Sequence, residues 1–159
     1  MNNKKGISAV VATVLIILIT VAAVTIIWAA IIPMISNQLE SGTICLDAVS
    51  AVQLKDEGYT CYETTMNSVD STYNVSLHVG RTAKAFDLKA IQVLVSVGGD
   101  TTTHRLTNMT GLGANGAKVF YINGTNYNNA TKIEIAPVVG VGNTEDSCDI
   151  SATKVLTAC

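Results

Sequence analysis

The sequence predicts an α+β protein in which a long N-terminal hydrophobic helix precedes a β-rich head, a small β-sandwich of the immunoglobulin-like kind. Residues 6–39 contain no charged side chain, which predicts the helix. Beyond them, short runs of alternating apolar and polar residues are separated by turn-forming clusters, which predicts the sandwich. We therefore divide the chain into residues 1–6, a hydrophobic helix at 7–40 and a head at 41–159.

The hydrophobic segment is long enough to span a membrane. Ala9 to Ile35 is 27 residues, interrupted only by three threonines and Pro33. As a helix it measures about 40 Å at about 1.5 Å per residue, whereas a bilayer needs about 20 apolar residues. A cleaved secretory signal has an apolar core of only about 7–15 residues, so this segment is too long for one. Lys4 and Lys5 favour a cytoplasmic N-terminus, which leaves the head outside.

The junction before the helix carries a second signal. Lys4, Lys5 and Gly6 stand directly before Ile7, and the string KKGISAVVATVL resembles the start of archaeal type IV pilins. In that family a membrane peptidase removes a short class III signal peptide after the glycine. The resemblance implies cleavage between Gly6 and Ile7, with a prepilin peptidase and a pilus assembly platform as partners. Bacterial pilins carry glutamate at the fifth mature position, where this chain has Val11.

Such a helix can leave lipid only if other helices replace the lipid contacts. A helical homopolymer does this, because identical apolar helices pack in the core of a fibre. Alanines allow close approach of helices in apolar surroundings, and the segment contains Ala9, Ala12, Ala22, Ala23, Ala29 and Ala30. Pro33 lacks an N–H, so we expect a kink or the helix end there, with residues 36–38 marking the exit into water.

The head is predicted to be mostly β. Alternating or short apolar runs predict strands at 73–79, 91–97, 119–122, 133–135 and 154–156. Turn clusters lie at 55–58, 67–72, 98–103, 111–116, 123–129 and 140–146. We find no helical period beyond the N-terminal segment.

All four cysteines, Cys45, Cys61, Cys148 and Cys159, lie in the predicted external part. An even count in an oxidising compartment predicts two disulfides. We prefer the local pairing, Cys45–Cys61 and Cys148–Cys159, although three connectivities are possible. A tight hairpin at 55–58 conflicts with this pairing, because it places Cys61 opposite Val52, so either the hairpin or the pairing is wrong.

Four sequons for N-glycosylation occur in the head, at Asn74, Asn108, Asn123 and Asn129. Each asparagine is followed two residues later by serine or threonine. We expect at least two of them to carry N-glycans. The alternative is that these asparagines serve only as turn formers.

Nothing in the sequence predicts catalysis, a cofactor or a metal. The net charge of −2 becomes −4 when the two lysines of residues 1–6 are removed, which argues against nucleic acid. The glycines of GLGANG (111–116) follow no hydrophobic strand, so we do not interpret them as a dinucleotide site. Glu145, Asp146 and Asp149 are better explained as a solvated acidic loop than as a calcium site, and His78 and His104 as surface residues.

Three functions remain. The leading prediction is a structural subunit of an archaeal pilus, a precursor in the cytoplasmic membrane and then an extracellular filament, which by family resemblance serves adhesion to surfaces or cells. An archaellin, the subunit of a swimming filament, is built in the same way. The third is a single-pass membrane-anchored binding or receptor domain that never polymerises. An enzyme is not expected.

Overall fold

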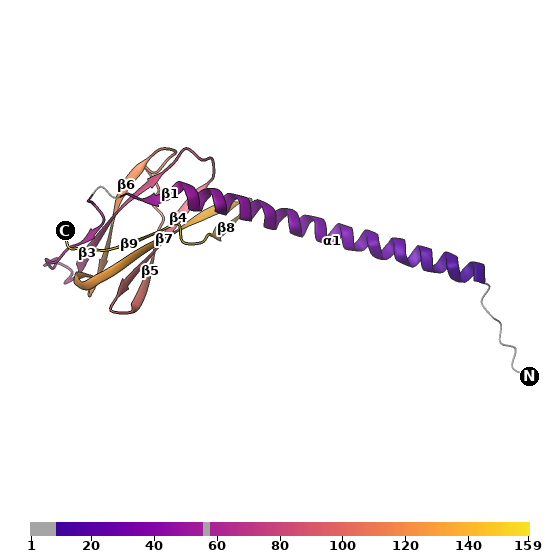
Figure 1. Cartoon of the computed structure of the whole chain (residues 1–159), viewed down its shortest axis with the longest axis horizontal. Coiled ribbons are helices and arrows are strands. Elements are labelled where there is room, and N and C mark those ends of the chain that lie inside the picture. Colours follow the sequence, from indigo (N-terminus) through magenta and orange to yellow (C-terminus); the bar gives the residue numbers. More distant parts are fainter. Residues whose placement is uncertain (1–8, 56–57) are drawn as a thin grey trace, which may run out of the picture. The chain divides into compact units, whose positions relative to one another are not determined.

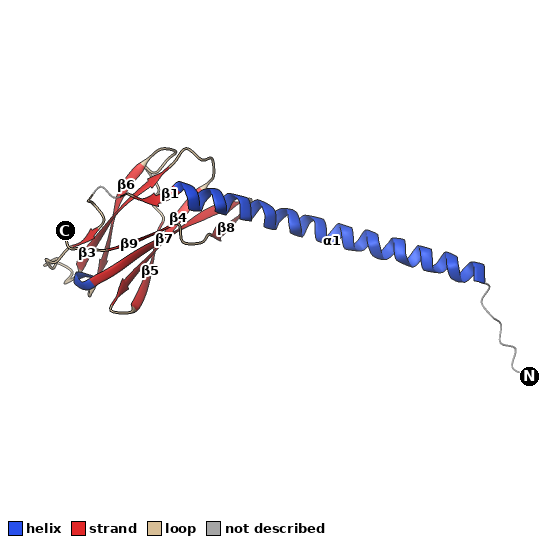
Figure 2. Cartoon of the chain, viewed as in Figure 1, coloured by secondary structure: helices blue, strands red, loops and turns tan. Residues whose placement is uncertain are grey.

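The computed structural model describes residues 9–55 and 58–159 of the chain (Figure 1). The chain divides into two compact units, with the boundary between Glu40 and Ser41. Figure 2 shows one long helix in the N-terminal part, and strands with a short helical turn in the rest.

Helix α1 runs from Ala9 to Ala51 without a break, 43 residues or about 65 Å. The expected helix end near Pro33 is therefore wrong, because α1 continues through this proline for a further 18 residues (33 to 51). A proline removes one hydrogen bond, here to the carbonyl of Ala29, but leaves the remaining helical bonds available.

The last turns of α1 contain a helical period that our sequence reading missed. Within the second unit, Ala48 and Ala51 are fully buried. Ala48 packs with Val139 and Cys148, and Ile44, Cys45 and Val49 border this cluster. Positions 44, 45, 48 and 51 lie on one face of a helix, so the apolar contacts of the head extend α1 beyond the predicted end at residue 40.

The head consists of two antiparallel sheets. Its strands are β1 (Val52–Leu54), β2 (Cys61–Tyr62), β3 (Tyr73–Arg81), β4 (Leu88–Val97), β5 (Asp100–Leu106), β6 (Ala117–Gly124), β7 (Ala130–Val141), β8 (Thr144–Ser147) and β9 (Ala152–Val155), and the short 3-10 helix η1 spans Tyr127–Asn129. In the first sheet, β3 pairs with β6, β1 and β2. In the second, β4 lies between β5 and β7, and β7 also pairs with β8 and β9.

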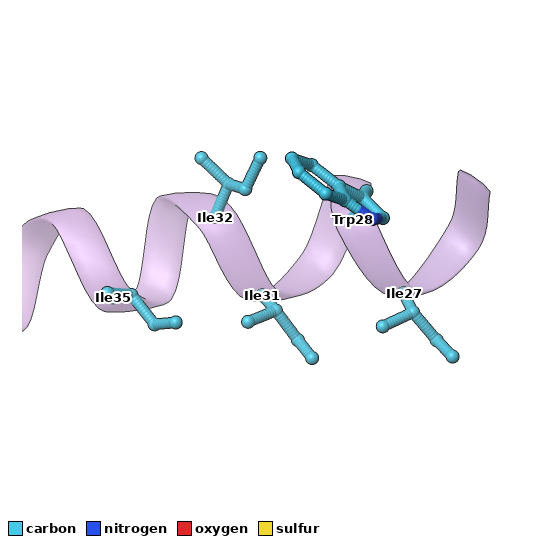
Figure 3. A pocket seen from close by; sticks show the side chains of 5 residues that line it. All are labelled: Ile27, Trp28, Ile31, Ile32 and Ile35. Atoms are coloured by element: carbon cyan, nitrogen blue, oxygen red, sulfur yellow. The ribbon is translucent and has the colours of Figure 1, made fainter. Parts of the chain in front are cut away.

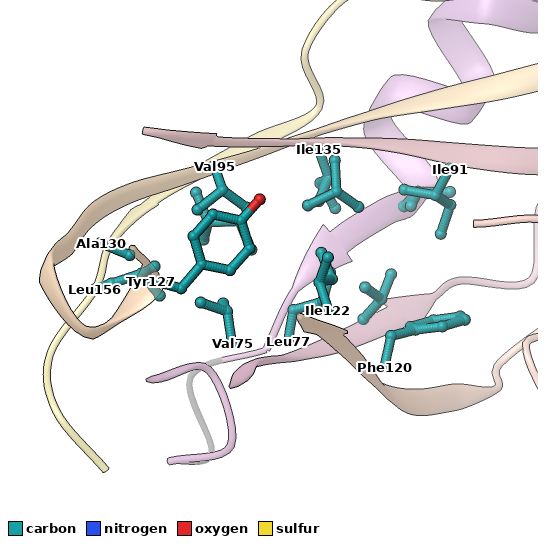
Figure 4. Close-up of a cluster of buried hydrophobic side chains, with 14 of the residues drawn as sticks. Val75, Leu77, Ile91, Val95, Phe120, Ile122, Tyr127, Ala130, Ile135 and Leu156 are labelled. Carbon is teal, nitrogen blue, oxygen red and sulfur yellow. The ribbon is translucent and has the colours of Figure 1, made fainter. Parts of the chain in front are cut away.

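The two sheets pack face to face around one hydrophobic core. Figure 4 shows side chains of β3 and β6 pointing toward those of β4 and β7. The core includes Val75, Leu77, Val79, Phe120 and Ile122 from the first sheet and Ile91, Val93, Val95, Ile133 and Ile135 from the second. The period-two alternation that predicted these strands is the alternation between core and outer face. The prediction of an α+β chain with a sandwich head is confirmed.

Two segments that we read as turns are hairpins. Val97 pairs with Asp100 across Gly98 and Gly99, whose φ angles of 59° and 102° suit a two-residue turn between β4 and β5. β7 and β8 are joined in the same way, with Gly142 at φ 58°. Strands β5 and β8 escaped prediction because β8 is polar throughout and β5 is polar except for Leu106 at its end, and their pairing with β4 and β7 makes them strands.

β1 and β2 do not form the tight hairpin at 55–58 that conflicted with the disulfide pairing we preferred. They do not pair with each other but with successive stretches of β3, where Leu54 lies opposite Val79 and Cys61 opposite Ser76. Leu77 and His78 lie between these two stretches of β3, and the Lys55 N–H donates to the His78 carbonyl at 2.8 Å.

Candidate functional site: an apolar helix and a disulfide-bonded head

The N-terminal part of α1 is apolar on every side. Its large exposed hydrophobic residues are Val10, Val11, Val14, Leu15, Ile16, Ile17, Leu18, Ile19, Val21, Val24, Ile26, Ile27, Trp28, Ile31, Ile32, Met34, Ile35 and Leu39. Among the residues that the structure describes, this is the one helix long and apolar enough to span a membrane, and its most apolar window has mean hydropathy 3.0. A helix without a polar face is stable only where lipid or protein surrounds it.

The polar side chains inside this segment are satisfied by the helix itself. The hydroxyls of Thr13, Thr20 and Thr25 donate to the carbonyls of Val10, Ile17 and Ala22, each at 2.9 Å. An unsatisfied hydroxyl in an apolar environment costs free energy, so this local bonding removes the penalty. The three threonines therefore do not interrupt the apolar surface.

A shallow groove of about 290 Å³ lies on the helix surface around Trp28 (Figure 3). Ile27, Ile31 and Ile35, spaced four residues apart, form one ridge, and Trp28 and Ile32 form the next. Rows of side chains four residues apart are the ridges that interdigitate when helices pack. The surface thus has the relief needed for close packing against another helix.

The disulfide connectivity differs from the local pairing that we preferred. Cys45 is bonded to Cys148 and Cys61 to Cys159, with sequence separations of 103 and 98. In both pairs the Cα atoms are 5.2 Å apart. The local pairing is wrong because the tertiary fold brings β2 to the C-terminus and the last turns of α1 to the end of β8.

The Cys45–Cys148 bond belongs to a set of contacts that hold residues 41–51 on the head. The Ser41 hydroxyl donates to Asp146 at 2.6 Å. The Lys84 ammonium pairs with Asp47 at 2.6 Å, although both side chains are about half exposed, so this ion pair stabilises little. The disulfide and the burial of Ala48 are the stronger constraints.

The C-terminus is held against β2. Besides the disulfide of Cys159, its backbone N–H donates to the Tyr62 carbonyl at 3.0 Å, and the Tyr62 N–H donates to the Thr157 carbonyl at 3.0 Å. The chain end is therefore held by a short backbone ladder in addition to a covalent bond.

The four sequon asparagines lie in different environments. Asn108, Asn123 and Asn129 are exposed, in the β5–β6 connection, near the end of β6 and in η1. Asn74 is half-buried within β3, and its side-chain nitrogen donates to a carboxylate oxygen of Glu63 at 2.9 Å. Nothing in the sequence indicated the carboxylate of Glu63 beside Asn74.

A polar cleft of about 360 Å³ lies between β5 and the connection that follows β6. Its lining includes Asp100, Thr102 and His104 from β5, Asn123 from the end of β6, Thr125 and Asn126 from the connection after it, and Tyr127 from η1. The Tyr127 hydroxyl and the His104 ring nitrogen Nε2 form a hydrogen bond. Burial lowers the pKa of His104 below its ordinary 6.5, which favours the uncharged imidazole near neutral pH.

The same tyrosine resists ionisation. Burial raises the pKa of Tyr127 above 10.0, and a hydrogen bond with the Thr102 side chain opposes this rise. With 4% of its surface exposed, Tyr127 belongs to the core and also lines the cleft. The cleft is therefore backed by a rigid aromatic ring.

The other candidate residues from the sequence are dispersed. His78 contacts the Tyr59 ring edge-on, whereas His104 contacts Tyr127, so the two histidines do not form a pair. In the acidic loop, Glu145 forms an ion pair with Arg105. Gly6 and Ile7 lie outside the described residues.

The helix and head together define a class of protein. An N-terminal helix long and apolar enough to span a membrane, followed by a head that contains two disulfides, is typical of a membrane-anchored or extracellular protein.

No protein-family model and no curated protein matches the chain. Among solved structures, the chain is similar to a bacterial immunoglobulin-like domain from the M. primoryensis ice-binding adhesin, at 13% identity and a TM-score of 0.38. The match covers 69% of this chain and 97% of that one. The assignment of the sandwich rests on the strand pairing described above.

Proposed function

We propose that the chain is the structural subunit of an extracellular filament of the archaeal type IV pilus kind. The observation that carries the proposal is the surface of α1, which is apolar and exposed on all sides from Ala9 to Ile35 and directly follows the Lys4–Ile7 junction. The family resemblance of that junction supplies the expected processing step after Gly6.

The helix has two environments that satisfy it, one before assembly and one after. As a precursor it lies in the cytoplasmic membrane, where its backbone hydrogen bonds are all internal. In a filament, copies of the same helix replace the lipid. Exchange between the two states is possible because helix packing among apolar residues depends on close van der Waals contact, which alanines and the ridges beside Trp28 support.

The head is suited to the outside of the cell. Its two disulfides are typical of an oxidising compartment, and its polar outer surface faces water in a filament. Such a filament acts in adhesion to surfaces or cells, and its work is structural rather than catalytic. Its partners are further copies of the chain, the prepilin peptidase and the assembly platform.

The deciding experiment is to determine the N-terminus of protein sheared from the cell surface, by intact mass. We expect a chain that begins at Ile7, in a sedimentable fraction of high mass. A chain that begins at Met1 and occurs only in membranes would overturn the proposal in favour of an anchored binding domain. Cells whose filaments rotate and drive swimming would instead identify the chain as an archaellin.

A pair of variants tests the processing step. Gly6→Leu should block cleavage, because a bulky side chain hinders the extended backbone in a protease cleft. Full-length precursor should then accumulate in the membrane, and filaments should be absent. Gly6→Ala, which adds a single methyl group, is the matched control and should retain more processing. Normal filaments from Gly6→Leu would contradict the proposal.

A further inference from the structure

Strand β5 carries polar side chains where the paired strand carries core residues. Three polar residues of β5 are paired with valines of β4 that face the core: Asp100 with Val97, Thr102 with Val95 and His104 with Val93. Directly opposed residues of paired strands project from the same face of a sheet, so these three lie on the core-facing side. The next core-facing residue of β5, Leu106, is apolar and packs against the core. The polar residues therefore occupy part of a core-facing row, and they line the cleft of about 360 Å³.

The core side of this cleft is built around a hydrogen-bonded tyrosine. The Tyr127 hydroxyl is hydrogen-bonded to the His104 ring and to the Thr102 side chain. Polar groups that face a core cost free energy unless they are hydrogen-bonded or in contact with water. Asp100 and Thr102 are exposed, so the cleft is open to water and to a ligand of similar polarity.

The rest of the lining comes mainly from the turn after β6. Gly124 lies so close to Tyr127 that a Cβ atom there would be 2.6 Å from the ring. The lack of a side chain lets the chain pass directly over the buried tyrosine. Thr125 and Asn126 follow, and both are exposed and line the cleft.

The lining favours a small, neutral ligand that is rich in hydroxyl groups. The Asp100 carboxylate accepts hydrogen bonds, whereas the Asn126 amide and the Thr125 hydroxyl both donate and accept. Among the described residues no lysine or arginine lines the cleft, so the charge of Asp100 disfavours an anion. Val97 and Tyr127 offer little area to an apolar ligand. The volume lies at the small end of the range for ligand sites, about 300–1,000 Å³, which suits a single sugar unit.

The cleft lies at the end of the sandwich away from the junction of α1 and β1. At one end of the first sheet, Tyr73 of β3 pairs with Gly124 of the cleft lining. At the other end, Arg81 of β3 pairs with Val52, the residue directly after α1. The steps along β3 from 73 to 81 correspond to about 27 Å at about 3.4 Å each. This distance from the junction suits the cleft to contact with other surfaces in the proposed filament.

We propose that the cleft binds a neutral sugar unit carried by another molecule, with Asp100 and Asn126 as the residues that hydrogen-bond its hydroxyls. The site would give the filament its adhesion target, and this role in adhesion rests on the proposed function. Binding of the sugar by the head does not depend on assembly.

Binding is tested by saturation-transfer NMR on the purified full chain, in a detergent without a sugar headgroup. The probes are the methyl glycosides of glucose, galactose and mannose at millimolar concentration, each compared with the corresponding anionic uronate. We expect at least one neutral glycoside to bind and to bind more tightly than its uronate. No binding of any neutral glycoside, or preferred binding of the uronates, would overturn the proposal.

Variants then locate the site. Asp100→Ala should weaken binding of the sugar by at least about tenfold, the loss expected for one hydrogen bond to a charged group. Asp100→Asn, which keeps an acceptor at the same position, should bind more tightly than Asp100→Ala, and Asn126→Ala should also weaken binding. Thr103→Ala, paired with Leu94 on the outer face of β5, is the control and should change the Kd by less than about twofold. A Kd unchanged in both Asp100→Ala and Asn126→Ala would refute the cleft as the site.

These results are separable from the test of the filament. A chain that begins at Ile7 in filaments but binds none of the glycosides would refute the sugar site and leave the filament intact. A membrane-bound chain that begins at Met1 and binds a glycoside through Asp100 would do the reverse.

Discussion

Replacing Cys45 and Cys148 by serine removes the covalent bond between the last turns of α1 and the chain segment after β8. The two residues are 103 apart in sequence. In the chain-entropy model, a closed loop of about 100 residues stabilises the folded state by about 4.7 kcal/mol, against about 3 kcal/mol for a loop of about 15 residues. With about 2–4 °C per kcal/mol for a chain of this size, the melting temperature should fall by about 10–20 °C.

The assay is calorimetric unfolding of the mature protein in detergent, together with non-reducing peptide mapping. Replacing Cys61 and Cys159 should cost a similar amount, because that separation is 98 residues. Mapping of the wild-type protein should recover a peptide that joins Cys45 to Cys148. A peptide joining Cys45 to Cys61, or a fall of less than about 3 °C in the first variant, would refute this reasoning.

Three further predictions concern the helix, the cleft and the core. Val21→Asp, which places a charge at a position 57% exposed on α1, should cost about 2.5–3.5 kcal/mol in the bilayer and abolish filaments visible by electron microscopy; assembled filaments would show that the helix is not the core. Because burial lowers the pKa of His104, its neutral form is favoured in the folded state, so the free energy of unfolding should fall as pH drops below 6.5 through the lower folded pKa. Denaturant titrations at pH 7.5 and 5 should show this fall, and His104→Gln should reduce it; an unchanged pH dependence would contradict the assignment. Leu77→Ala, at a fully buried position, should lower the free energy of unfolding by about 2–5 kcal/mol in chemical denaturation, whereas Val69→Ala, at a position 85% exposed, should change it by less than about 0.5; equal effects would place Leu77 outside the core.

Strand prediction succeeded where one face of a strand is buried. Val75, Leu77 and Val79 are fully buried, as their alternation predicted. It failed for β5 and β8, whose polar side chains carry no alternation of hydrophobicity. Such strands form because a neighbouring strand makes hydrogen bonds to their backbone groups. The sequence of the strand itself does not show which segment will pair with it.

Sequence reasoning predicted only part of the candidate site, because the rest consists of segments that are far apart in the chain. The apolar surface of α1 follows from composition alone. The cleft beside His104 was missed, because Asp100 and Asn126 come from segments that meet only after β5 and the β6–β7 connection are placed. The sequon at Asn123 drew attention to one residue of the cleft lining. The sequence did not indicate the residues of β5 that also line it.

By itself the sequence determined the helix, the strands of the core and the likeness of the N-terminal junction to pilins, because hydropathy, periodicity and short motifs are properties of neighbouring residues. Only the tertiary structure decided that α1 ends at Ala51, that Cys45 pairs with Cys148, and that Asn74 stands opposite Asn123. Each of these depends on contacts between segments far apart in the chain. Such contacts are selected by the packing of the whole sandwich core, which no single segment encodes.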